Sequence, residues 1–285
     1  MKLVSRLFVS SRPISWINTA FPFAVAYYLS TGTVSPELVI GTLFFLIPYN
    51  LLMYGVNDVF DYESDLTNPR KGGLEGALLE PKYHRATLLV AALFALPFVF
   101  YLMLIGSVSS NLTLLVVLFA VVAYSAKYLR FKEIPILDSF TSAIHFLGPL
   151  IYGLALAGVS VSSLELVVSI AAFLLWGMAS HAFGAIQDIR ADREAGISSI
   201  ATFFGARLTV RLAFAFYLFA GLALTYLPGR YVFACLAAVP YLVVTAREFS
   251  ITDETCEQAN RGWKRFIWLN FFAGALVSAL LIGPS

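Results

Sequence analysis

The sequence predicts an all-α membrane protein, a bundle of nine transmembrane helices with a cytoplasmic N-terminus. The 285 residues are 59% hydrophobic and only 13% charged, whereas about a quarter of the residues in soluble domains are charged. The apolar residues form repeated runs of about 20, the length that crosses ~30 Å of hydrocarbon. The charged residues gather between alternate runs, which indicates a chain that crosses the bilayer many times.

We expect one polytopic domain over residues 1–285. The predicted spans lie near residues 14–31, 37–57, 87–106, 111–128, 135–158, 164–186, 207–227, 230–247 and 265–283. If the N-terminus is inside, only Arg230 of the 19 Lys and Arg residues falls outside, which is the bias of cytoplasmic loops. The outer connections are short. We therefore expect an active site at the cytoplasmic face of the cell membrane, with membrane lipid and no nucleic acid as a partner.

Residues 57–65 place four acidic groups directly after a long apolar run. On one helix, Asn57, Asp58, Asp61 and Asp65 would project within about a quarter of a turn. Carboxylates at this spacing repel one another, so a cation is expected among them. If this stretch stood alone, a solvated helix end would be the favoured explanation.

A second acidic cluster follows the apolar run that ends near Ile186. Asp188 and Asp192 are four residues apart and share a helix face. Carboxylate oxygens are ligands that Mg²⁺ prefers, together with water and phosphate oxygens. We therefore predict two Mg²⁺ ions in a shared site, with these candidate ligands: Asn57, Asp58, Asp61, Asp65, Asp188 and Asp192.

Basic and hydroxyl side chains near the two clusters are candidates for binding an anionic substrate. Glycine permits close backbone approach, and Arg and Lys donate to phosphate. The candidates are Arg70, Lys71, Tyr124, Tyr128, Arg130, Lys132 and Arg193. Ordinary positive-inside charge and interfacial snorkelling are the alternative explanations.

Polar residues inside the predicted spans precede both clusters at helical spacing. Asn50 and Tyr54 lead to the first cluster, and His181 lies seven residues before Asp188. Intramembrane polar groups face the bundle interior, so these side chains are expected to line a cavity that binds substrate. His181 is equally consistent with hydrogen-bonded packing, and His145 is expected to pack.

The two clusters resemble the motifs of the UbiA-type intramembrane prenyltransferases. The first motif, Asn-Asp-x-x-Asp-x-x-x-Asp, is matched in full, and the second, Asp-x-x-x-Asp, is followed by the family's Gly and Ser at Gly196 and Ser199. The segment 124–132 is similar to a Tyr/Lys segment of the family. The loop after the first motif departs from the family pattern at Gly72 and Gly73, because a Pro usually follows the basic pair. The second motif departs from it at Ser198, where Lys is frequent.

The resemblance implies Mg²⁺-dependent transfer of a prenyl group from an allylic diphosphate, such as dimethylallyl diphosphate, to an apolar acceptor dissolved in the membrane. Segments 12–24, 47–51 and 68–76 are most similar to the lycopene elongases of C50 carotenoid biosynthesis, which implies addition to the ends of lycopene, with or without hydration. The implied catalytic residues are Asn57, Asp61, Asp188 and Asp192. His181 is a further catalytic candidate, because either it or the diphosphate itself could take the final proton, and Phe60, Tyr54 and Phe183 are candidates to surround the allyl cation.

Two alternatives remain open from the sequence. Prenylation of a quinone precursor or another lipid acceptor would use the same metal chemistry with a different acceptor pocket. In a different class, the carboxylates could form the path of a cation-coupled transporter, although coupling sites usually lie near the membrane midplane in repeated halves.

Overall fold

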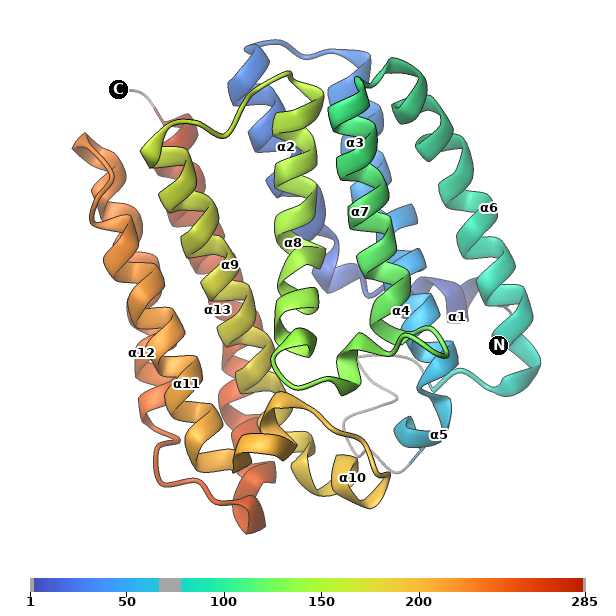
Figure 1. The fold of residues 1–285 in the computed structure, drawn as a ribbon, viewed down its shortest axis with the longest axis vertical. Helices are drawn as coiled ribbons and strands as arrows, with labels where there is room; N and C mark the ends of the chain where they lie inside the picture. The colour runs from blue at the N-terminus through green and yellow to red at the C-terminus, as the bar shows by residue number, and fades with distance from the viewer. Residues whose placement is uncertain (1–2, 67–77, 284–285) are drawn as a thin grey trace. The chain divides into compact units, whose positions relative to one another are not determined.

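The computed structural model describes residues 3–66 and 78–283. The described residues form α-helices and short 3₁₀ turns, and no strand occurs among them (Figure 1). The α-helices are α1 Leu3–Ser10, α2 Trp16–Thr31, α3 Pro36–Leu46, α4 Pro48–Phe60, α5 Tyr62–Asp65, α6 Pro81–Ile105, α7 Val108–Ser125, α8 Leu137–Leu156, α9 Leu164–Ala185, α10 Ile189–Glu194, α11 Ile200–Leu224, α12 Val239–Ala246 and α13 Ala259–Ile282. The 3₁₀ turns are η1 Pro13–Ser15, η2 Phe131–Glu133, η3 Ile186–Asp188, η4 Gly229–Ala238 and η5 Asp253–Gln258. The all-helical prediction is confirmed.

Eight helical segments of the described chain are long and apolar enough to cross a membrane. They are Pro36–Phe60, Pro81–Ile105, Val108–Ser125, Leu137–Leu156, Leu164–Glu194, Ile200–Leu224, Gly229–Ala246 and Asp253–Ile282. The remaining predicted span, 14–31, corresponds to α2, whose 16 residues are fewer than the roughly 20 that a full crossing needs. The count of nine and the cytoplasmic N-terminus therefore stay predictions.

The predicted second span, 37–57, is two helices rather than one. Pro48 begins α4, and Ile47 before it has φ −120° and ψ −60°, because proline disfavours helical geometry in the preceding residue and has no N–H to donate. The Asn50 side chain lies over this break and donates to the carbonyls of Phe45 and Leu46 at 2.9 and 3.1 Å. The carbonyls that the break leaves open are thus satisfied.

The chain forms two compact units, residues 1–131 with 144–160 and residues 132–143 with 161–285. The first unit is built around an aromatic core. Its fully buried rings are Phe23, Phe44, Phe45, Tyr49 and Tyr152. Most neighbouring pairs among them meet edge to face or tilted, as Phe44 and Phe45 do at 4.8 Å, whereas Phe23 and Tyr152 are stacked at 5.9 Å. Aromatic quadrupoles favour both edge-to-face and offset-stacked pairs. The prediction of a single domain stays a prediction.

The second unit depends on small residues where its helices cross. A Cβ added to Gly221 of α11 would lie 2.8 Å from the Cβ of Ala238, and one added to Gly177 of α9 would lie 2.7 Å from the Cβ of Ala143. Both distances are shorter than a carbon–carbon contact of about 3.5–4.0 Å. These glycines therefore permit the close helix approach on which the packing of this unit is built.

Candidate active site

The first acidic cluster lies where α4 gives way to α5. Asp61 is the junction, with φ −102° and ψ 2°, so the single continuous helix expected over residues 57–65 is wrong. The N–H groups of Asp61 and Asp65 still donate four residues back, to the carbonyls of Asn57 and Asp61 at 2.9 and 2.8 Å. The chain therefore bends without losing the spacing that brings these side chains together.

All three aspartates of this cluster are buried. Asp58 is 1% exposed, Asp61 5% and Asp65 6%, whereas the neighbouring Glu63 is exposed. A buried carboxylate is costly unless it is paired or bound to a metal. A solvated helix end does not bury its carboxylates, so the burial argues for a built site.

Arg12 supplies a cation to this cluster, and the sequence reasoning did not identify it as a site residue. Its Nη2 lies 3.1 Å from Asp58 Oδ1 and 3.5 Å from Asn57 Oδ1, and its guanidinium carbon lies 4.1 Å from the Tyr54 ring centroid. Burial disfavours the charged guanidinium, but Asp58, Tyr54 and Asp65 outweigh that cost and raise the pKa of Arg12. The residue has φ 49°, so its backbone is held in the left-handed region to make these contacts.

Asn57 connects the cluster to α7. Its Nδ2 donates to Asp61 Oδ2 at 2.5 Å and to Ser125 Oγ at 2.9 Å. From the segment that follows α7, Arg130 reaches Asp61 Oδ1 at 3.8 Å and the Phe60 carbonyl at 3.5 Å. The structure thus brings the predicted residues Asn57, Asp61 and Arg130 together.

The oxygens of this cluster fit a hard cation. Asp58 Oδ1 is paired with Arg12, but its buried Oδ2 has no hydrogen-bond partner among the described residues. A buried carboxylate oxygen without a donor is the kind of ligand that Mg²⁺ takes. No group of three or more His, Cys, Asp or Glu side chains in the described chain is already gathered as a metal site.

The other candidates around the first cluster have different surroundings. Tyr124 packs edge to face on His145 at 5.1 Å. Tyr128 is 90% exposed, with φ 78°, and Lys132 lies in η2. Arg70 and Lys71 lie outside the described residues. Roles for these residues in binding stay predictions.

Asn50 and Tyr54 precede the cluster on α4 and differ in exposure. Asn50 is 0% exposed and also donates to Thr19 Oγ1 at 2.6 Å, so its described contacts support the α3–α4 break and α2. Tyr54 is partly buried and lies under the guanidinium of Arg12. Tyr54 is therefore next to the acidic cluster, and Asn50 is enclosed about two helical turns before Asn57.

The second acidic cluster is also two short pieces rather than one helix. Asp188 ends η3 and Asp192 lies in α10. Both aspartates are partly exposed. Gln187, just before them, is fixed by donating to the Gly184 carbonyl at 2.9 Å and accepting from Asn260 Nδ2 at 2.6 Å. The start of the cluster is therefore anchored to α9 and α13.

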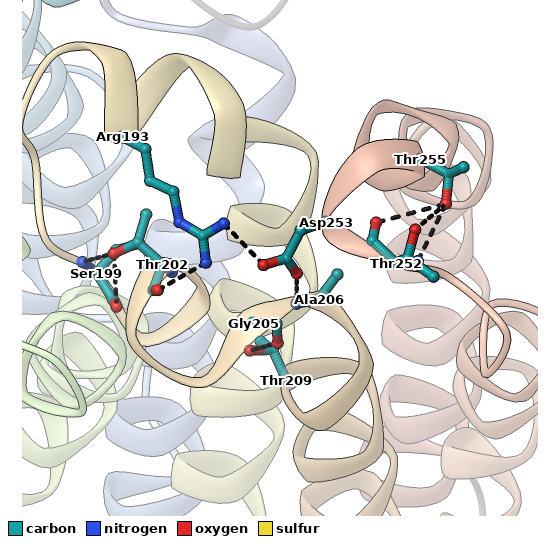
Figure 2. A network of polar contacts seen from close by, with 9 residues as sticks. All are labelled: Arg193, Ser199, Thr202, Gly205, Ala206, Thr209, Thr252, Asp253 and Thr255. Carbon is teal, nitrogen blue, oxygen red and sulfur yellow. Dashed lines mark hydrogen bonds and ion pairs between the residues drawn. The ribbon is translucent and has the colours of Figure 1, made fainter.

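Arg193, a predicted phosphate ligand, is engaged in a polar network (Figure 2). Its Nη1 pairs with Asp253 Oδ2 at 2.7 Å, and its Nη2 donates to the Thr202 carbonyl at 3.1 Å. Asp253 Oδ1 accepts from the Ala206 N–H at 2.7 Å, next to the bend at Gly205 with φ 75°. These contacts give Arg193 a supporting role between α10, α11 and η5.

His181 and Phe183 lie on α9, near the second cluster in sequence. The Nδ1 of His181 is 3.0 Å from Ser139 Oγ, and the ring is partly exposed. Phe183 is 1% exposed within an apolar cluster with Ile186 and Ile200. Phe183 therefore serves the packing of this unit, while His181 keeps a polar partner.

Comparison with known proteins places the chain in a family. Residues 19–272 match the family model described as the UbiA prenyltransferase family. The chain is 53% identical over 98% of its length to the "C(50) beta-cyclic carotenoids biosynthesis protein LbtBC" of Dietzia sp., of which it spans only 65%. It is 48% identical to a "Lycopene elongase/hydratase" of Corynebacterium glutamicum, over 99% of this chain and 98% of that one.

The solved structures show the same fold. The "UbiA homolog from Archaeoglobus fulgidus bound to DMAPP and Mg2+" superposes with a TM-score of 0.67 at 17% identity, over 96% of this chain and 99% of that one. The fold, the sequence similarity and the motifs all indicate an enzyme rather than a cation-coupled transporter. The chain belongs to the UbiA prenyltransferase family and is a multi-pass membrane prenyltransferase.

Proposed function

We propose that this prenyltransferase adds a five-carbon prenyl group from dimethylallyl diphosphate to an end of lycopene, and that water is added in the same reaction. The observation that carries the proposal is the 48% identity to a lycopene elongase/hydratase along nearly the whole of both chains. A solved relative of the same fold is described as bound to this donor and Mg²⁺. The cytoplasmic face of the cell membrane is the proposed location, because Lys and Arg concentrate on that side of the predicted topology.

The residues proposed to hold Mg²⁺ are Asn57, Asp58, Asp61, Asp65, Asp188 and Asp192. The unpartnered Asp58 Oδ2 supports this assignment for the first cluster. When bound, Mg²⁺ would neutralise charge on the diphosphate and stabilise its departure. Two ions is the proposed number, since the two clusters together offer more oxygens than one octahedral ion uses.

The described side chains give the first cluster the electrostatics that an ionising diphosphate requires. As the allylic C–O bond breaks, negative charge grows on the leaving group, and cations placed beforehand stabilise it. Arg12 and Arg130 are such cations, at 3.1 Å from Asp58 and 3.8 Å from Asp61. In the proposal they limit the repulsion between carboxylates and diphosphate, and Arg70, Lys71, Tyr124, Tyr128 and Lys132 contribute to diphosphate binding. Arg193 contributes only a small part of the binding, because Asp253 already engages it.

The allyl cation left behind needs an electron-rich, dry surrounding. Aromatic faces attract cations by about 0.5–2 kcal/mol each. The ring of Tyr54 already contacts one cation, the Arg12 guanidinium. Tyr54 and Phe60, which flank the first cluster, are proposed for this role. The terminal double bond of the acceptor then attacks the cation, which forms the new C–C bond and leaves a tertiary cation on the acceptor.

The test uses membranes that contain the protein, Mg²⁺, dimethylallyl diphosphate and lycopene. We expect carotenoid products heavier by one or two C5 units, with the mass of water added, and no product after chelation of Mg²⁺. Intact diphosphate with lycopene, together with turnover of a quinone precursor, would overturn the acceptor assignment in favour of the alternative.

A further inference from the structure

A histidine and a serine of the second unit form a polar pair that the family motifs do not include. Ser139 Oγ, in the first turn of α8, lies 3.0 Å from His181 Nδ1 on α9. Ser139 is 0% exposed, whereas His181 is partly exposed.

The helix crossing fixes the distance between the two side chains. One turn away from the pair, a Cβ on Gly177 would lie 2.7 Å from the Ala143 Cβ and 2.9 Å from its Cα. His181 follows Gly177 by four residues and Ser139 precedes Ala143 by four. In antiparallel helices such positions lie opposite each other. The close contact at Gly177 therefore sets the approach of Ser139 to His181.

Ser139 is also held through its backbone. Asp138, 0% exposed, accepts from the Ser139 N–H at 2.6 Å with Oδ1 and from the Ile200 N–H at 2.7 Å with Oδ2. One buried carboxylate thus ties the start of α8 to the start of α11. The hydroxyl of Ser139 has a defined position relative to the imidazole.

The chemistry of imidazole gives this pair a consequence. A neutral histidine carries a proton on one ring nitrogen and a lone pair on the other. The hydrogen-bond partner of one nitrogen determines which nitrogen holds the proton. If Nδ1–H donates to Ser139 Oγ, the lone pair lies on Nε2. A ring so fixed can accept a proton at a defined place.

This inference rests on the proposed function, whose last intermediate is a tertiary cation that needs a proton acceptor. We propose that Ser139 is a positioning residue that holds His181 with Nε2 as the proton acceptor for hydration. The water oxygen uses a lone pair to form the C–O bond, the O–H bond pair stays on oxygen, and the proton moves to Nε2. The competing route takes a proton from the adjacent carbon, and that C–H pair becomes a double bond.

The experiment measures the ratio of hydrated to dehydrated C5-extended products by mass, together with total C5 transfer. We expect Ser139→Ala and the near-isosteric Ser139→Cys to lower the ratio at least fivefold while total transfer stays within threefold. His181→Gln should lower the ratio as much. Combining Ser139→Ala with His181→Gln should lower it no further, because the two residues act as one unit.

A matched control is Ser180→Ala on the same helix. Its hydroxyl donates to the Trp176 carbonyl at 2.6 Å and lies 3.0 Å from Tyr217 Oη, so its loss should leave the ratio unchanged. An unchanged ratio of hydrated to dehydrated products in Ser139→Ala overturns the inference. If that variant is not recovered folded, an unchanged ratio in Ser139→Cys overturns it. Wild type that extends lycopene without any hydrated product also overturns it, whereas wild type that transfers no C5 unit overturns the proposed function.

Discussion

The two acidic clusters differ in burial and in the contacts of the arginines near them. In the first, Asp58, Asp61 and Asp65 are buried, and Arg12 and Arg130 are directed at them. In the second, Asp188 and Asp192 are partly exposed. The two arginines of the second cluster lie in ion pairs with acids of another segment, Arg190 with Glu257 and Arg193 with Asp253.

The difference follows from burial. A charge removed from water costs several kcal/mol, so the first cluster needs cations built into the protein. A partly exposed carboxylate keeps more of its hydration. The arginines next to Asp188 and Asp192 in sequence hold η5 against α10. Basic residues next to a motif in sequence are therefore not necessarily those that balance its charge.

The comparison is tested most strongly at Arg12. Arg12→Met keeps an apolar stem in place of the aliphatic part of the side chain and leaves the Asp58 carboxylate buried without its cation. Breaking a buried pair in this way costs about 3–5 kcal/mol, measured as the free energy of unfolding in detergent. Adding Asp58→Asn should recover much of this loss, because the stranded charge is removed.

Arg6→Met is the matched control on the same N-terminal segment. Arg6 pairs with Glu80 at 3.5 Å, with side chains 36% and 45% exposed, and such pairs contribute about 1 kcal/mol or less. An equal loss in both variants would contradict the distinction between buried and exposed pairs.

The next largest effect is expected at Asp61. Asp61→Ala removes a proposed metal ligand that lies between Asn57 Nδ2 and Arg130. We expect diphosphate release to fall at least about 100-fold with any acceptor, an effect of roughly 2.7 kcal/mol on the barrier. Glu63→Gln, an exposed acid two residues away, should change the rate by less than threefold. Activity that survives Asp61→Ala would sink the metal assignment.

A smaller effect is expected from Gly205→Ala at the bend of α11. Gly205 has φ 75°, and an added Cβ would meet Asp253 Oδ1 at 3.1 Å. The left-handed backbone alone costs a residue with a Cβ about 1–2 kcal/mol. The unfolding midpoint in detergent should fall accordingly, while Gly274→Ala, where an added Cβ meets nothing within 4 Å, should not lower it.

The smallest effect is expected from the ion pair of the second cluster. Arg193→Met removes the ion pair with Asp253. The side chains of Arg193 and Asp253 are 46% and 34% exposed, so the free energy of unfolding should fall by about 1 kcal/mol or less. The Michaelis constant for the diphosphate should rise less than threefold if Arg193 is mainly supporting. A rise of tenfold or more with unchanged stability would instead favour the phosphate-binding role predicted from the sequence.

The sequence determined the class of the protein because its signals are local or periodic. Apolar runs specify helices that cross a bilayer whatever they pack against, and carboxylates at i,i+3 and i,i+4 spacing predict a cation site before any fold is known. The resemblance to the UbiA family rests on such spacing at Asp58, Asp61 and Asp65 and at Asp188 and Asp192. The fold class, the family and the enzyme class were predictable for this reason.

Only the tertiary structure decided which cations and hydrogen bonds serve each cluster. Arg12 is some 45 residues before its partners, and as one basic residue on the side predicted to be cytoplasmic it is indistinguishable in sequence from ordinary positive-inside charge. The pairing of Ser139 with His181 likewise depends on a contact between distant segments. Such contacts form only when helices pack, because the spacing within one helix carries no information about its neighbours.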